Sequence, residues 1–141
     1  MIQRHRLLVV ALIATLMLAC SVPAQSSIVI NELMASNGEA AKDPQGQFDD
    51  WIELHNPSDA SADVGGMYLT DDLQDPTKWR IPTGVTITAK GHLLIWADND
   101  TTDEGLHASF SLSASGEEVG LYDRDGVTLV DSVVFGEQPI D

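Results

Sequence analysis

The stretch FSLSASGEEVGLYDRDGVTLVDSVVFGEQ, residues 110–138, decides the fold class of this chain. It contains three extended segments with alternating apolar residues, separated by turns at Ser115-Gly116 and Asp125-Gly126. Alternation with a period of two is typical of β-strands that bury one face. An Asp-Gly pair tolerates the positive φ that a tight hairpin requires. No residue in the stretch is an evident nucleophile, general base or metal ligand set, so the pattern predicts strands rather than chemistry.

The same strand-and-turn pattern continues through the rest of the chain. Short apolar or alternating runs end at Gly, Pro, Asn or Asp, and no helical periodicity follows the N-terminal segment. The predicted strands are residues 27–34, 50–55, 66–70, 78–81, 85–88, 92–97, 109–112, 118–123 and 127–135. Nine short strands without intervening helices predict an all-β, antiparallel sandwich or barrel rather than a parallel α/β sheet.

Residues 1–24 are predicted to be a secretory signal peptide. Arg4 and Arg6 precede an apolar run at residues 7–19, and small residues follow it. The run is shorter than the roughly 20 apolar residues of a membrane span. A retained signal anchor is the alternative.

Two processing sites compete at the end of this segment. Small residues at Val22 and Ala24 favour cleavage that releases a soluble chain beginning at Gln25. Alternatively, Cys20 ends a run that resembles a bacterial lipobox and would carry lipid, although Met17 stands where such boxes prefer Leu. Removal of Cys20 would leave no cysteine, so no disulfide would support the fold.

The region after residue 24 is strongly acidic. It holds all 22 acidic residues but only five basic ones, Lys42, Lys78, Arg80, Lys90 and Arg124, which gives a net charge of −17. Such a surface repels DNA and RNA, whose binding depends on Lys and Arg neutralising phosphates. Cations, basic proteins or neutral glycans are the compatible partners, and solubility alone is the simpler explanation.

Several blocks resemble the bacterial lamin tail domain in order and spacing. They are IVINELMASN, DDWIELHNPSD, GGMYLTDD, PTKWRIP, GHLLIWAD, LHASFSLSASGEEVGLYD and VDSVVFGEQ, and they cover residues 28–141 almost completely. The resemblance implies an immunoglobulin-like β-sandwich at residues 25–141, found on exported bacterial proteins as a binding or tethering unit without catalytic residues.

The resemblance also implies an incomplete C-terminus. Relatives continue past FGEQ with a Tyr-Gly-Arg-like segment and another strand, whereas this chain stops at Asp141. We therefore expect a sandwich that lacks its last strand. An uncovered edge strand invites association with another chain.

Three tryptophans lie within predicted strands, and inward-facing tryptophans of a sandwich usually belong to the core. The alternative is an outward-facing aromatic surface that stacks on sugar rings, which requires two of the three to be exposed together. Trp79 is the best candidate for such a ligand site, because Lys78 and Arg80 flank it.

Glu32 and Glu53 could form an acid/base pair of the glycosidase type if neighbouring strands brought them together. Each lies inside an apolar run, where a charged group needs hydrogen bonds, so a structural polar network is favoured. His55, His92 and His107 occur singly, whereas a zinc site needs several converging ligands. No serine-hydrolase or phosphate-loop motif is present, and we expect no enzyme activity.

Calcium is the cofactor that the sequence allows. Asp98, Asp100, Asp103 and Glu104 place four carboxylates in one loop, and hard oxygen ligands of this kind suit Ca²⁺. A second cluster contains Asp71, Asp72 and Asp75. Neither has the spacing of a calcium-binding loop motif, and solvated acidic loops are the alternative.

These observations favour a non-catalytic exported module, located outside the cell or in the cell envelope, that recognises a protein or cell-surface polymer through loops and edges. The alternative is a carbohydrate-binding module using exposed tryptophans, and the third hypothesis is an enzyme using Glu32 and Glu53. No nucleic-acid partner is expected, and a membrane partner is expected only if Cys20 is lipidated.

Overall fold

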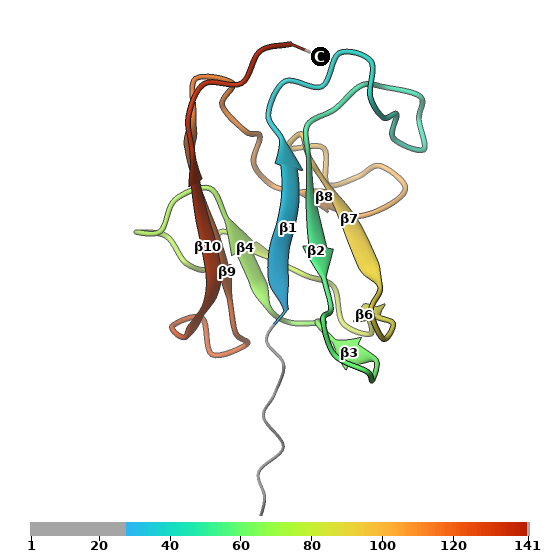
Figure 1. Ribbon diagram of the computed structural model, residues 1–141, viewed down its shortest axis with the longest axis vertical. Coiled ribbons are helices and arrows are strands. Elements are labelled where there is room, and N and C mark those ends of the chain that lie inside the picture. Colours follow the sequence, from blue (N-terminus) through green and yellow to red (C-terminus); the bar gives the residue numbers. More distant parts are fainter. Residues whose placement is uncertain (1–27, 141) are drawn as a thin grey trace, which may run out of the picture.

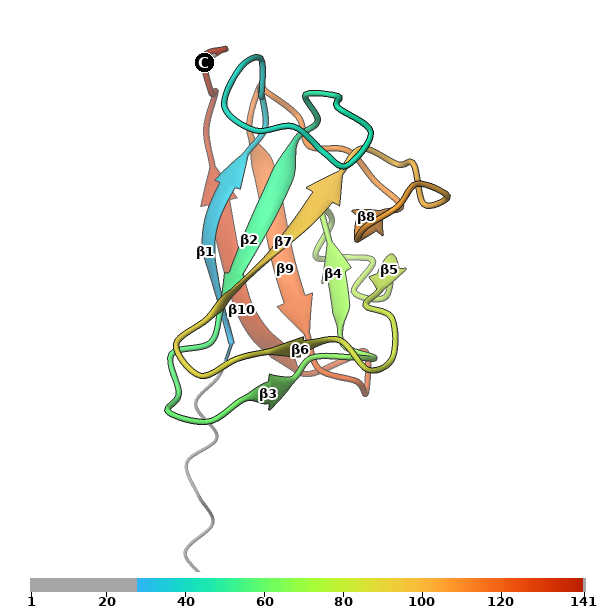
Figure 2. The same ribbon diagram turned by 90° about the vertical axis from the view of Figure 1, so that its right-hand side faces the viewer.

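The computed structural model describes residues 28–140, which form two four-stranded sheets and a two-stranded ribbon (Figure 1). The first sheet has the order β1-β2-β7-β8, the second has the order β10-β9-β4-β5, and β3 pairs with β6 at one end (Figure 2). The strands are β1 (Val29–Met34), β2 (Trp51–His55), β3 (Ala62–Asp63), β4 (Tyr68–Thr70), β5 (Trp79–Arg80), β6 (Thr86–Ile87), β7 (His92–Ala97), β8 (His107–Ala108), β9 (Glu117–Tyr122) and β10 (Leu129–Phe135). The predicted signal peptide, including Cys20, lies outside the described residues. Between residues 28 and 140, no helix is long and apolar enough to cross a membrane.

Alternation along the strands separates the core from the outer faces. In the first sheet, Ile52 pairs with Ile95 and Leu54 pairs with Leu93, so these rows share the inner face. In the second sheet, Leu69 lies opposite both Leu121 and Trp79. Because successive strand residues point to opposite faces, the residues between these rows face outward.

The core lies between the two sheets and consists mainly of aliphatic side chains. Its fully buried members include Ile52, Leu54, Leu69, Ile81, Ile87, Ile95, Val119 and Leu121. Burying one such side chain contributes roughly 1.5–3 kcal/mol. The predicted immunoglobulin-like β-sandwich is therefore confirmed.

Three details differ from the sequence-based expectation. The strand predicted at residues 109–112 forms instead at residues 107–108, as β8. β8 runs parallel to β7, whereas an antiparallel sheet was predicted. The chain also forms the short strand β3, which two residues are too few to reveal by periodicity. The last strand begins at Leu129 instead of Val127, because Asp125 Oδ1 accepts hydrogen bonds from the amides of Val127 and Thr128 and extends the turn.

One side of the sandwich is closed by two edge strands from different sheets. β1 and β10 run side by side in the same direction (Figure 1). The amide of Ile30 donates to Asp131 Oδ2 (2.8 Å), and the amide of Ala35 donates to Gln138 Oε1 (2.8 Å). Side chains of one edge thus satisfy backbone donors of the other, in place of a continuous ladder.

A fully buried asparagine, Asn56, connects the segments at the end of the sandwich where β2 ends. Asn56 Nδ2 faces the carbonyl oxygens of Ala60, Ile87 and Thr88 at 2.8–3.1 Å. Its Oδ1 accepts from both the amide and the hydroxyl of Ser58. The side chain therefore joins the turn after β2 to the end of β6 and to the residue that follows β6.

Candidate functional site

The three tryptophans are all buried, with exposed fractions of 8% for Trp51, 9% for Trp79 and 6% for Trp96. Trp79 packs in the core between the sheets. Trp51 and Trp96 are paired on the outer face of the first sheet, and both are buried there. Burial agrees with the expected core positions and contradicts the alternative of an exposed aromatic surface, because a sugar ring needs an accessible indole face.

Glu32 and Glu53 are brought together, as the acid/base hypothesis requires, but on an open surface. They are directly opposite in the β1–β2 pairing and lie on the outer face of the first sheet. Asn31 Nδ2 donates to Glu53 Oε1 (2.7 Å), and His92 Nε2 lies 3.9 Å from the same oxygen. The His92 ring also stacks on His55, with ring centroids 4.4 Å apart. This arrangement is a polar network on the outer face of the sheet, in which the side chains of Glu53 and His92 are 25% and 47% exposed.

The predicted calcium site at residues 98–104 is not formed. Asp98 Oδ1 accepts from the amide of Asp100, and Asp98 Oδ2 lies 2.7 Å from His107 Nδ1. Asp100 Oδ1 accepts from the hydroxyl of Thr102. Within residues 28–140, no three acidic, histidine or cysteine side chains converge as a metal ion requires. Asp103 and Glu104 therefore do not join Asp98 and Asp100 in one ligand set, since turn and histidine contacts use those carboxylates.

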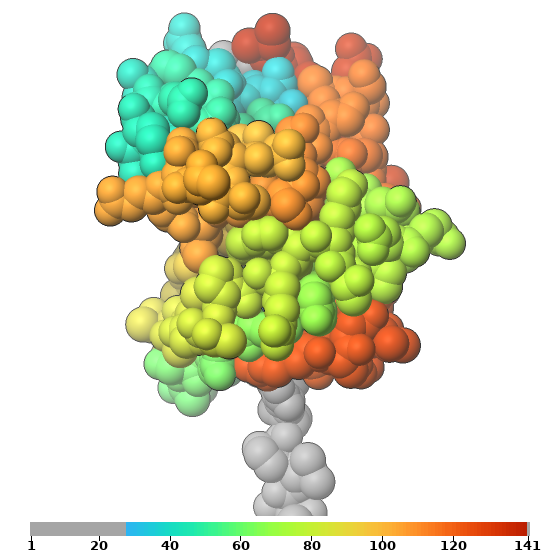
Figure 3. Space-filling view, turned by 180° about the vertical axis from the view of Figure 1, so that it is seen from behind, coloured from blue at the N-terminus to red at the C-terminus, as the bar shows by residue number. Residues whose placement is uncertain are grey.

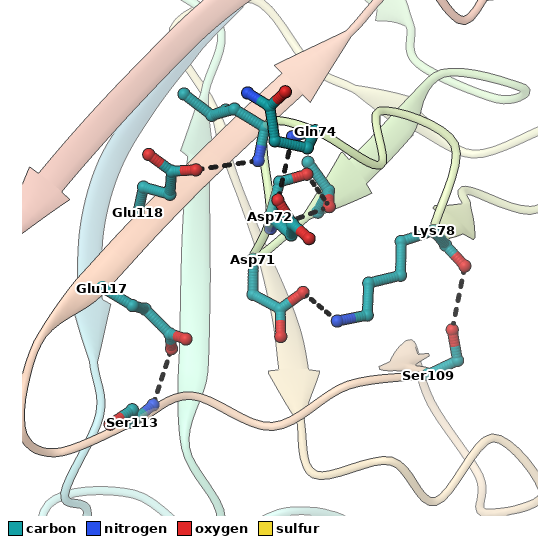
Figure 4. Close-up of polar contacts among 10 residues, drawn as sticks. Asp71, Asp72, Gln74, Lys78, Ser109, Ser113, Glu117 and Glu118 are labelled. Atoms are coloured by element: carbon teal, nitrogen blue, oxygen red, sulfur yellow. Dashed lines mark hydrogen bonds and ion pairs between the residues drawn. The ribbon is translucent and has the colours of Figure 1, made fainter.

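The second acidic cluster is also structural. Asp71 forms a 2.5 Å ion pair with Lys78, and Asp72 Oδ1 accepts from the amide of Gln74. The intervening loop lies on the second sheet, where the Leu73 amide donates to Glu118 Oε1 (3.0 Å). Figure 4 shows these contacts, with the Asp71 carboxylate directed at the Lys78 ammonium group.

A shallow groove lies where β5 of one sheet approaches the segment after β8 of the other. Figure 3 shows the yellow-green 71–80 segment beside the orange segment that carries residues 109–111. The groove encloses about 270 Å³ and is lined by Asp71, Lys78, Asn99, Ser109, Phe110 and Ser111. Ser109 Oγ donates to the carbonyl oxygen of Lys78 (3.1 Å), which joins the two sheets at this point.

The groove contains one of the residues predicted to bind a ligand. Lys78 lines it, with its ammonium group 5.8 Å from the centre of the Phe110 ring. Trp79 points into the core, and Arg80 lies over Tyr68 on the other face of the second sheet. The structure therefore separates Lys78, Trp79 and Arg80 instead of joining them in one site.

Acidic groups near the loop end have perturbed protonation equilibria. Burial raises the pKa of Asp49, and the charges of Asp98 and Asp43 raise it further, while His107 lowers it. Burial also raises the pKa of Glu117, which is partly offset by the hydrogen bond that the Ser113 amide donates to Glu117 Oε1 (2.6 Å).

Sequence reasoning missed the buried pair of His107 and Asp98. The exposed side-chain fractions are 1% for His107 and 8% for Asp98. Nearby, Asp49 Oδ2 and Trp51 Nε1 are buried without a hydrogen-bond partner among the described residues. The sequence offered no signal for the pair, because nine positions and a turn separate its members.

The comparisons identify the family. A model of the lamin tail domain matches residues 21–137, which is most of the chain. No curated protein matches the sequence. The lamin tail domain is an immunoglobulin-like module that is generally non-enzymatic, in agreement with the two stacked sheets. This chain belongs to the lamin tail domain family.

Proposed function

We propose that this chain is an exported, non-catalytic binding or tethering module that recognises a protein or cell-surface polymer through its loops and sheet edges. The main support is that groups able to do chemistry already have structural partners. Glu53 is held by Asn31, and Asp98 is held by His107. Activated nucleophiles and bases require a defined geometry around a reacting group, which these contacts do not provide.

The groove between the sheet edges is the recognition surface that we favour. Polar groups from both sheets line the groove. One of them, Asn99, has a left-handed backbone conformation (φ 65°), which is uncommon for a residue other than glycine. Binding surfaces commonly occur on loops that a rigid scaffold positions. Lys78 supplies the cationic group of the groove, and its side chain is 34% exposed.

The experiment is capture from cell-envelope extracts by immobilised protein. We expect a specific partner to be retained, and we expect Lys78→Met to reduce its retention. Lys90→Met is the matched control, because Lys90 also pairs with an aspartate (Asp59, 3.0 Å) but lies in the turn between β6 and β7 and does not line the groove. Equal retention by both variants would exclude the groove, and no retained partner would contradict the binding function.

A turnover assay tests the non-catalytic part of the proposal. The Glu32→Gln and Glu53→Gln variants should fold as the parent does and should match it on a panel of glycoside and ester substrates. Activity in the parent that either substitution abolishes, with unchanged unfolding, would establish an enzyme instead.

A further inference from the structure

Two loops meet at one end of the sandwich. We call residues 35–50 the entry loop and residues 98–106 the return loop; both lie at the upper end in Figure 2. Gln45 of the entry loop donates to Asp43 Oδ2 (2.6 Å) and accepts from the Glu104 amide of the return loop (2.6 Å). Pro44 packs beside Gly105. The loops are therefore in direct contact.

Internal hydrogen bonds give the entry loop a defined shape. Asn37 Nδ2 donates to the carbonyl oxygens of Ala41 (2.7 Å) and Asp49 (2.8 Å). Asn37 Oδ1 accepts from the amides of Ala40 and Ala41. Asn37 itself is 8% exposed, so its side chain is the buried centre around which the entry loop is ordered.

His107, at the end of the return loop, lies between two hydrogen-bond acceptors. Its Nδ1 is 2.7 Å from Asp98 Oδ2, and its Nε2 is 3.1 Å from the carbonyl oxygen of Glu104. A neutral imidazole carries one N–H and could donate to only one of them. The imidazolium carries two and satisfies both, so the surroundings of this buried ring fit its charged form.

The charges of the two loops lead to the same assignment. The carboxyl groups acting on His107 are Asp98 and Asp103 of its own loop and Asp49 of the entry loop. Asp43 and Asp50 act in turn on Asp49. Of the interactions that perturb Asp49, only that with His107 favours its ionised form. Neutral His107 would leave several partly buried carboxylates without this compensation, and uncompensated buried charge is costly.

We propose that His107 is a charge-operated latch of the return loop: its imidazolium joins Asp98, at the start of this loop, to the carbonyl oxygen of Glu104 near its end, and loss of its proton opens the return loop. The latch is independent of the proposed function, because it requires no ligand.

The protonation equilibrium has the direction that the latch requires. Burial lowers the pKa of His107, but the hydrogen bonds to Asp98 and to the Glu104 carbonyl, with the charges of Asp98 and Asp103, outweigh burial and leave the pKa above 6.5. The latched form therefore prevails below the folded-state pKa. It is lost as the pH rises through that value.

Imidazole ¹⁵N spectroscopy of the purified protein tests the charge state directly. We expect both ring nitrogens of most His107 rings to be protonated at pH 6.5, the ordinary pKa of histidine, because the pKa of His107 is raised above that value. A neutral His107 tautomer under those conditions would overturn the proposal.

Amide hydrogen exchange tests loop release. The amide of Trp96 donates to the Leu106 carbonyl and the amide of Asn99 donates to the Ala108 carbonyl, so both report on the return loop. We expect their protection factors to fall as His107 deprotonates. Unchanged protection across the His107 titration would refute the latch, because the loop would then stay closed without the charge.

Variants separate the charge from the packing. His107→Gln and Asp98→Asn should each abolish the pH dependence of protection, whereas His92→Gln should retain it. If the first two fail to fold, the parent spectra and exchange data still decide the matter. Adding calcium or a chelator should leave the His107 titration unchanged; a shift of this titration would identify a metal site instead of a latch.

Discussion

Replacing Asn56 by alanine should be among the most damaging substitutions at a polar residue. The side chain is completely buried; its Nδ2, with two hydrogens, faces three carbonyl oxygens, and its Oδ1 accepts two hydrogen bonds. Alanine removes all of these contacts and leaves the carbonyl oxygen of Ile87, whose contact with Asn56 is buried, without this donor. The backbone groups that lose their partner are fixed by the surrounding strands and turns.

The magnitude follows from this inventory. A net hydrogen bond is worth about 0.5–1.5 kcal/mol, and a buried group left unsatisfied costs about 1–3 kcal/mol. Two amide hydrogens and two accepted bonds therefore give a loss of about 3–5 kcal/mol in the free energy of unfolding. For a domain of this size, that loss lowers the Tm by about 10–20 °C.

Urea unfolding followed by tryptophan fluorescence measures the change, since all three tryptophans are buried. Asn56→Asp is a second probe, because it keeps the acceptor but replaces the donors by an oxygen facing three carbonyl groups. Asn31→Ala is the matched control: Asn31 is exposed, and its side chain donates one hydrogen bond to Glu53. A loss below about 1 kcal/mol for Asn56→Ala would refute the reasoning.

Three further results are expected. Raising the pH should lower the free energy of unfolding, because the pKa of His107 is raised on folding. The stabilisation by His107 is fully present below the unfolded-state pKa of 6.5 and is lost as the pH rises through the folded-state pKa. The urea midpoint of His107→Gln should therefore lack this part of the decline with pH. Gly120→Ala should destabilise the domain by about 1–3 kcal/mol in thermal unfolding, because a Cβ at Gly120 would lie 2.5 Å from Leu73 Cδ2, whereas Gly136→Ala, with nothing within 4 Å, should be neutral. Asp131→Ala should leave the Ile30 amide without its acceptor and increase self-association in size-exclusion chromatography, and behaviour identical to that of Ser132→Ala would show that this edge is not protected by Asp131.

The two sheets could be predicted because the alternation and turn residues of each strand agree with its packing in the folded domain. Residues 117–135 alternate as a hairpin requires, and Gly126 has the positive φ (67°) expected of the Asp-Gly turn. Alternation also places Ile52 and Leu54 in the core and Glu53 outside. Both features, alternation and turn residues, depend on residues that are close together in the chain. They can therefore be recognised from one sequence.

The candidate site was harder to predict because it depends on distant contacts. The tryptophans Trp51 and Trp96 lie on an outer face, where alternation alone predicts exposure, but both are buried. Calcium binding was one interpretation of the carboxylate cluster at residues 98–104, with solvated acidic loops as the other, whereas the approach of His107 gives Asp98 a different partner. Neither the burial of these tryptophans nor the histidine contact has a local sequence signature.

The parallel course of β1 and β10 has a mechanical consequence. The chain enters β1 at one end of the sandwich and leaves β10 at the other (Figure 1). Tension applied between these points would act along the strands and shear many backbone hydrogen bonds at once, instead of peeling them apart one by one. Forced unfolding is governed by the unfolding rate. We therefore expect the domain to unfold slowly when it is pulled at these two ends.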